Sequence, residues 1–285
     1  MTRDRSALLA AVALVWLPVP TGQDWTVRYT AKQLDCARFL ESGESTIQTE
    51  TGGRRRQQTS ERRAVWQFRA SPSKEGIALE GWMDSLVVSR RSAETTISPD
   101  TDGLLGGRYR GSLSATGAYS SQVRPFVPDE VAEVAGMATA LDDFFPPLPT
   151  RQLLPGGTWS DSQGLTIRRL SDSALSGLSL FRFELSRKDE SRVAPRPVDT
   201  LALPLRQLSE EQGTFVWHPL LGLVRRDRRI VVQTAVPASR TVRQAVRSRV
   251  EQRIRVTRDL SGDPTACRRE GGNGGKEGKS EGGKE

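Results

Sequence analysis

The sequence predicts a mainly β (α+β) protein: a strongly curved antiparallel sheet, or half-barrel meander, with one central amphipathic helix. Three observations lead to this class. Short runs in which apolar and polar residues alternate recur through residues 24–260. Turn signals separate these runs every ten to fifteen residues, a spacing typical of an antiparallel meander. One segment, residues 128–145, has a helical period instead.

Composition excludes several classes of protein and site. The 285 residues are 36% hydrophobic and 27% charged, with a formal net charge of +8. Such a chain is too apolar to be wholly disordered and too polar for a multispanning membrane protein. One His and two Cys exclude multi-histidine metal sites, Cys-rich zinc modules and iron–sulfur clusters. We expect no metal and no other cofactor, and we expect His218, in a predicted hairpin turn, at the surface.

The N-terminal residues have the layout of a secretory signal. Two arginines stand within residues 1–5, residues 7–17 form an uninterrupted apolar run of eleven, and Pro18 and Pro20 then break it. A helix of this length spans about 16 Å, too short for a bilayer core of about 30 Å. The alternative is a buried first helix. We expect a signal peptide over residues 1–23 and an exported protein, periplasmic or extracellular, with no transmembrane segment.

The first half of the mature chain is expected to be a strand meander. Alternation begins at Trp25, and a Gly-Gly pair at residues 52–53 separates STIQTET from RRRQQTSERRAVWQFRA, which indicates a hairpin. The segment IALEGWMDSLVVSR follows as another strand. Tyr109 and Tyr119 mark two shorter strands.

Residues 128–145, PDEVAEVAGMATALDDFF, are expected to form the helix that joins the two meander halves. Pro128 and the acids after it suit a first helical turn, and the prolines from Pro146 onward end it. We expect the apolar stripe to pack on the sheet. Its residues recur at spacings of three and four: Val131, Val134, Ala135, Ala138, Leu141 and Phe145.

The second half is expected to return as strands and to end in a disordered tail. The strand segments are GGTWSDSQGLTIRRL, LSLFRFELSRKD, DTLALPLRQL, GTFVWHPLLGLVRR and RRIVVQTAV. Residues 261–285 are rich in Gly, Lys and Glu and offer almost no apolar side chain to bury, so we expect that tail to be disordered.

Residues 239–258 fit two structures. From 242 to 256 the four valines and Ile254 occupy even positions and the arginines occupy odd positions, which is the pattern of a strand. Val242, Val246, Val250 and Ile254 are also four apart, which fits a helix. The β-branched residues favour the strand.

As a strand, this segment would expose a basic face formed by Arg243, Arg247, Arg249, Arg253 and Arg255. Residues 224–258 as a whole hold eleven arginines against two acids. Such a face suits anionic lipid headgroups, lipopolysaccharide or polysaccharide, and export makes nucleic acid an unexpected partner. The alternative is a solvated strand face that discourages edge pairing.

We expect neither an enzyme nor a catalytic residue. The chain lacks the H-E-x-x-H and G-x-G-x-x-G patterns. An enzyme hypothesis would rest on Glu130, Glu133, Asp142 and Asp143, since paired carboxylates do glycosidase chemistry when a cleft holds them about 5–10 Å apart. The other interpretation of these residues is a solvated helix face.

Export would place Cys36 and Cys267 in an oxidising compartment, where two cysteines form a disulfide. The final strand of a curved meander often returns beside the first half, which would bring the two residues together. We expect this disulfide, with the two Cα atoms within about 7 Å of each other. The alternative is two unpaired thiols.

The order of elements carries a resemblance. The chain resembles uncharacterised bacterial secreted domains with a curved sheet around helical cover. The features that carry the resemblance are a first meander, a helix leading into FFPPLP, then LLPGGTWSD, and a second meander containing GTFVWHPLLGLV. More distantly it is similar to the LolA/LppX-type lipoprotein-carrier fold. The resemblance implies an exported, non-enzymatic protein that binds an apolar or amphipathic ligand, such as a lipid, between sheet and helix. The alternative is an envelope structural or interaction module that uses its basic Arg-rich face.

The signal peptide can be tested directly. We expect the mature N-terminus to lie within residues 19–25, because the apolar run is too short to anchor the chain across a bilayer. Intact-mass measurement of protein recovered outside the cytoplasm checks this. Recovery of that protein with residues 1–17 still attached would contradict cleavage.

Overall fold

A computed structural model describes residues 27–132, 134–135, 137–175, 178–193, 205–238 and 244–261. The predicted signal peptide and almost all of the predicted tail lie outside these residues, as do Arg243 and Cys267. No cysteine among the described residues is a free thiol. Because the expected partner of Cys36 is not described, the Cys36–Cys267 disulfide stays a prediction.

The first half of the described chain is a strand meander after one helical turn. The turn, α1 (Ala31–Leu34), has a capping box between Thr30 and Gln33. The glycines at residues 52 and 53 both have positive φ, as the tight turn of the first hairpin requires. The elements that follow α1 are β1 (Arg38–Thr51), β2 (Arg54–Ser73), β3 (Gly76–Arg91), β4 (Thr96–Ile97), η1 (Asp102–Leu104), β5 (Tyr109–Leu113) and β6 (Tyr119–Val123).

The second half is also a strand meander, but its short strands come first and its long strands last. Its strands are β7 (Thr158–Ser160), β8 (Thr166–Arg169), β9 (Ser173–Leu175), β10 (Leu178–Val193), β11 (Leu205–His218), β12 (Gly222–Val236) and β13 (Val246–Arg258). Residues 246–258 are therefore a strand, which confirms that interpretation of the described part of residues 239–258.

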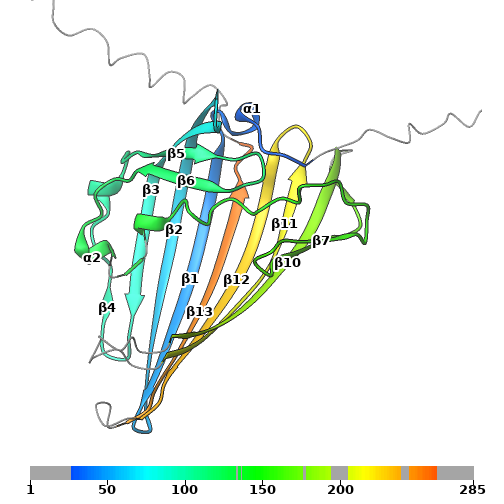
Figure 1. Cartoon of the computed structure of the whole chain (residues 1–285). Coiled ribbons are helices and arrows are strands. Elements are labelled where there is room, and N and C mark those ends of the chain that lie inside the picture. Colours follow the sequence, from blue (N-terminus) through cyan, green and yellow to red (C-terminus); the bar gives the residue numbers. More distant parts are fainter. Residues whose placement is uncertain are drawn as a thin grey trace, which may run out of the picture.

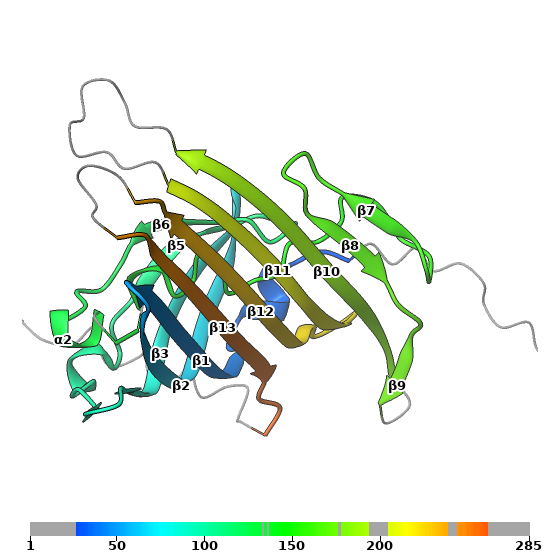
Figure 2. The same cartoon turned by 90° about the horizontal axis from the view of Figure 1, so that it is seen from below.

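The described strands form one open antiparallel sheet of thirteen strands (Figures 1 and 2). Along the sheet the order is β6-β5-β3-β2-β1-β13-β12-β11-β10-β8-β7, while β4 pairs with β3 and β9 with β10. The two halves join where β13 pairs with β1, from Phe39 opposite Arg258 to Thr51 opposite Val246. The last strand thus returns beside the first, and the mainly β, antiparallel prediction is confirmed.

The connection between the halves has to cross the sheet. β6 lies at one edge and β7 at the other, so residues 124–157, here called the strap, run from edge to edge. Figure 1 shows the strap passing in front of the central strands in the upper part of the sheet. We call the face under the strap the core face, and the opposite face the outer face.

The predicted helix over residues 128–145 is wrong. The described residues there contain one turn of α-helix, α2 (Asp129–Ala132), and one of 3₁₀-helix, η2 (Met137–Thr139); the others are turns and bends. Side chains from distant parts of the chain take the place of helical hydrogen bonds. Tyr109 Oη donates to the carbonyl oxygen of Met137 at 3.0 Å, and Tyr29 Oη donates to that of Pro146 at 3.2 Å. Because these carbonyl groups accept hydrogen bonds from side chains, they do not need the backbone N–H donors that a helix would provide.

The predicted apolar stripe is nevertheless buried on the sheet at four of its six positions: Val131, Val134, Leu141 and Phe145. Val131 and Leu141 are 0% and 1% exposed. Phe144 lies among aromatic rings of the core face, with its ring centroid 5.3 Å from that of Phe68. Gly81 on β3 makes room for the strap, because a Cβ there would lie 2.8 Å from the Phe68 ring and 3.1 Å from a methyl group of Leu141.

Truncating a strap anchor should destabilise the fold. We expect Leu141→Ala to lower the free energy of unfolding by about 2–5 kcal/mol, the usual cost of truncating a buried Leu. Leu154→Ala, a matched change in the same strap at a side chain that is 73% exposed, should cost well below 1 kcal/mol. Urea denaturation of both variants measures the difference. Equal stabilities would contradict the packing of the strap.

Candidate functional site

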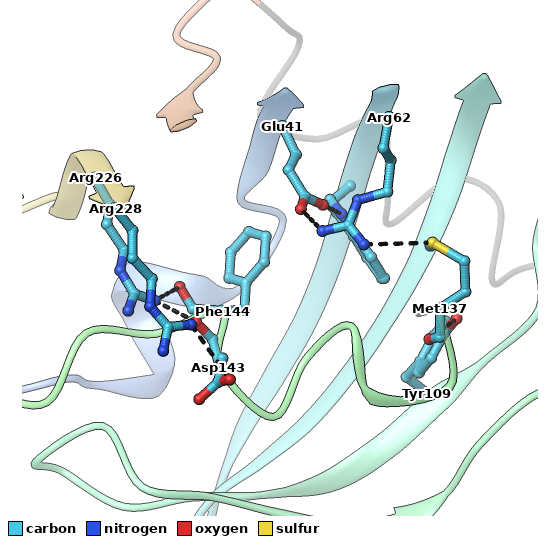
Figure 3. A network of polar contacts seen from close by, with 9 residues as sticks. Glu41, Arg62, Tyr109, Met137, Asp143, Phe144, Arg226 and Arg228 are labelled. Atoms are coloured by element: carbon cyan, nitrogen blue, oxygen red, sulfur yellow. Dashed lines mark hydrogen bonds and ion pairs between the residues drawn. The ribbon is translucent and has the colours of Figure 1, made fainter. Parts of the chain in front are cut away.

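A layer of charged side chains lies on the core face under the strap (Figure 3). Glu41 on β1 has a side chain that is only 2% exposed. Its carboxylate accepts hydrogen bonds from the guanidinium of Arg62 and, at 2.7 Å, from Trp66 Nε1. A buried carboxylate of this kind needs such donors, because an unpaired charge is costly away from water.

The second half of the sheet contributes the rest of this layer. Arg228 Nε donates to Glu211 at 2.6 Å, and its Nη1 lies 3.3 Å from the Asp143 carboxylate of the strap. Arg226, 4% exposed, donates from Nη1 to the carbonyl oxygens of Asp143 and, at 2.9 Å, of Phe144. Burial, followed by the neighbouring charge of Arg228, lowers the pKa of Arg226 to about 10, so the group stays protonated at neutral pH.

This layer fixes the strap rather than forming an open site. A cavity of about 90 Å³ remains beside it, lined by Glu41, Arg62, Asp143, Arg226 and Arg228 among others. The three arginines of the layer face three carboxylates, Glu41, Asp143 and Glu211.

The carboxylates behind the enzyme hypothesis take part in separate contacts. Asp142 pairs with Arg124 at 2.9 Å, whereas Asp143 pairs with Arg228. Glu130 is exposed, and Glu133 lies outside the described residues.

His218 is not at the surface. It is 5% exposed, and its Nδ1 accepts hydrogen bonds from the backbone N–H groups of Leu220 and Leu221 at 3.2 and 3.1 Å. Burial, with a contribution from Arg258, lowers its pKa, which keeps the ring neutral and able to accept. The residue caps the β11–β12 turn.

The outer face carries the predicted basic face. Val256 and Ile254 of β13 point to the core face, so the odd-numbered side chains of this strand point outward. The structure places Arg247, Arg249, Arg253 and Arg255 there, while Arg243 lies outside the described residues.

Two carboxylates organise these arginines. Glu251 accepts hydrogen bonds from Arg229, Arg249 and Arg253 at 2.9, 3.2 and 3.0 Å. The bonds from Arg229 and Arg249 are the main cause that lowers the pKa of Glu251 to about 2.

Asp227 holds a second pair, with Arg225 and Arg255 each 2.6 Å away. Burial raises the pKa of Asp227, but hydrogen bonds from the two arginines outweigh it and keep the pKa below its ordinary value. In the sequence, these two acids stand out only as the negative charges among eleven arginines. Their place among outward-facing arginines depends on the β12–β13 register, in which Asp227 lies opposite Arg255.

The outer face is hollowed along β13. Three cavities of about 720, 260 and 610 Å³ follow one another there; the first two share Arg253, and the last two share Arg249. We call this feature the trough. Its charged outer-face residues are Arg55, Arg63, Arg206, Arg229, Arg247, Arg249, Arg253 and Arg255, with Glu44, Glu50, Glu61, Glu184, Asp227 and Glu251.

The trough is less basic than the sequence count suggests. Eight arginines face six carboxylates among its outer-face residues, an excess of two. Three of the eleven arginines in residues 224–258 are absent from this face: Arg226 and Arg228 hold the strap, and Arg258 lies over the Phe39 ring at 5.5 Å. No group of three or more metal-ligating side chains occurs in the described part of the chain.

Comparison with known proteins identifies no family. No family model matches the chain, and no curated protein matches it. Among solved structures it is similar to a DUF1329 family protein from Desulfovibrio piger, with 9% sequence identity over 82% of this chain and 90% of that one, and a TM-score of 0.17. So low a score carries no argument, and the resemblance to lipoprotein carriers rests on the sequence alone. Within the described residues, no helix is long and apolar enough to span a membrane.

The role of Arg226 can be separated from that of its neighbour. Arg226→Met removes the donor for two strap carbonyls and the positive charge beside Glu211, so we expect it to cost about 3–5 kcal/mol of unfolding free energy. Arg225→Met removes the preceding arginine, which is 48% exposed and paired with Asp227, and should cost below about 1 kcal/mol. Urea denaturation compares the two variants. Similar losses would show that Arg226 does not hold the strap.

Proposed function

We propose that this protein is an exported, non-enzymatic interaction module of the cell envelope, and that it binds an anionic partner along the trough. One observation carries the proposal. Four arginines face outward along β13 in two pairs, Arg247 with Arg249 and Arg253 with Arg255; the members of each pair are about 6.6 Å apart, and Glu251 stands between the pairs. They lie on a hollowed face with an excess of positive charge.

The chemistry of these side chains supports an anionic partner. A guanidinium is planar, stays charged and presents a fork of donors that matches carboxylate and phosphate oxygens. Glu251 and Asp227 hold five arginines in place, so less side-chain entropy is lost when an anion arrives. Because the pKa of Glu251 is about 2, this arrangement persists throughout the neutral pH range.

The other function implied by the resemblance, an apolar or amphipathic ligand between sheet and cover, has less support. The strap already occupies that space: Leu141 and Phe144 are 1% and 3% exposed against the sheet. The cavity beside them is about 90 Å³ and lined by charged groups, which suits no acyl chain.

Vesicle binding tests the proposal. We expect binding to vesicles that contain phosphatidylglycerol, none to vesicles of phosphatidylcholine alone, and weakening with added salt because exposed charges are screened. Arg255→Gln should weaken binding about fivefold, since one arginine near an anionic surface contributes about 1 kcal/mol.

Arg110→Gln is the matched control. Arg110 is 58% exposed with its Nε 2.6 Å from Glu80, and Arg255 is 59% exposed with its Nε 2.6 Å from Asp227, but Arg110 lies outside the trough. The proposal would be contradicted if added salt did not weaken binding, or if Arg255→Gln and Arg110→Gln weakened binding equally.

A further inference from the structure

We infer that the ligand of the trough is a linear acidic polysaccharide, a glycan that carries at most one carboxylate per sugar. The inference rests on the proposed function and names the class of anion that this site takes. Four features of the trough lead to it: its length, its sparse charge, its neutral polar groups and its lack of aromatic side chains.

The length of the trough fits an extended ligand. From Arg247 to Arg255 the strand rises about 26 Å, and the cavities along it are joined by shared residues. A single phosphate or headgroup would occupy one cavity only. A linear polymer lying along β13 would contact Arg247, Arg249 and Arg255 at once.

The charge of the trough fits a sparsely charged polymer. A nucleic acid strand carries one phosphate per roughly 3.4 Å, which is about eight charges over this length. The six carboxylates of the trough would repel such a chain, and the excess of positive charge is only two. A glycan with at most one carboxylate per sugar carries fewer charges over the same length, because one sugar unit is longer than the spacing between two phosphates.

The remaining groups fit sugar hydroxyls. Neutral donors and acceptors stand between the charged residues: Ser42, Gln48, Gln57, Gln212, Thr214 and Gln233. On one wall Glu44 and Glu61 lie directly opposite each other, both exposed, and neither makes an ion pair within the described part of the chain. Two such carboxylates leave acceptor positions open, which hydroxyl groups satisfy without adding charge.

Nucleobases and acyl chains find few partners in this trough. None of the residues lining its three cavities is aromatic, whereas proteins that hold single-stranded nucleic acid stack the bases on aromatic rings. Among the lining residues whose side chains face outward, Leu208 is the one large apolar residue.

Calorimetry of the full chain tests the inference with five probes at one salt concentration. The probes are oligogalacturonate long enough to fill the trough, galacturonate trimers, a neutral glucan as long as the oligogalacturonate, polyphosphate, and vesicles containing phosphatidylglycerol. We expect oligogalacturonate to bind most tightly, galacturonate trimers to bind about tenfold more weakly because they reach fewer arginines, and the glucan not to bind.

A double variant separates hydroxyl recognition from charge. Glu44→Ala with Glu61→Ala makes the trough more positive for every anion but removes the hydroxyl acceptors. We expect the ratio of oligogalacturonate affinity to polyphosphate affinity to fall about tenfold. Glu75→Ala with Glu94→Ala changes the net charge equally at exposed acids outside the trough and should leave the ratio unchanged.

The outcomes distinguish the two proposals. Binding to vesicles or polyphosphate without binding to oligogalacturonate would overturn this inference and leave the proposed function standing. An unchanged ratio in the Glu44/Glu61 variant would also overturn it. Failure of every anionic probe to bind would overturn both.

Discussion

The arrangement of this protein depends on one buried cation. Arg226 lies on the core face, almost fully removed from water, and donates to two successive carbonyls of the strap. Because its charge is costly to bury, it requires both the strap and the neighbouring Glu211. The strap needs the same contact, since its backbone is not helical there. Burial of the Phe144 ring among the core aromatic side chains depends on these hydrogen bonds from Arg226 to the strap.

The pairing of β13 with β1 gives the sheet its two unlike faces. Since side chains alternate along a strand, one register sends the apolar residues of β13 to the core and its arginines outward. The arginines of β12 and β13 therefore have two roles, and the burial of each side chain decides which role it has. Arg226 and Arg228 are structural cations in a balanced layer, whereas Arg249, Arg253 and Arg255 stand in an open trough with spare donors.

The trough combines order with accessibility. Glu251 and Asp227 each bind more than one arginine, which neutralises part of the charge and fixes side chains that would otherwise be mobile. What remains is a long, weakly basic surface with many neutral polar groups. Such a surface favours ligands that offer both charge and hydroxyls over ligands that offer charge alone, because the remaining acids oppose a dense polyanion.

The sequence by itself determined the antiparallel strands, the Gly-Gly hairpin, the return of β13 and which residues of the strap are apolar. These features follow from the alternation of apolar and polar side chains and from the residues at turns, both of which depend on neighbours in the sequence. Only the tertiary structure decided that residues 128–145 are not a helix, because Tyr109 and Arg226 donate to carbonyls of this segment from distant strands. It also decided where the arginines go. Charge counted along a chain does not reveal which side chains a register turns inward, nor that Glu251 meets three arginines from two strands.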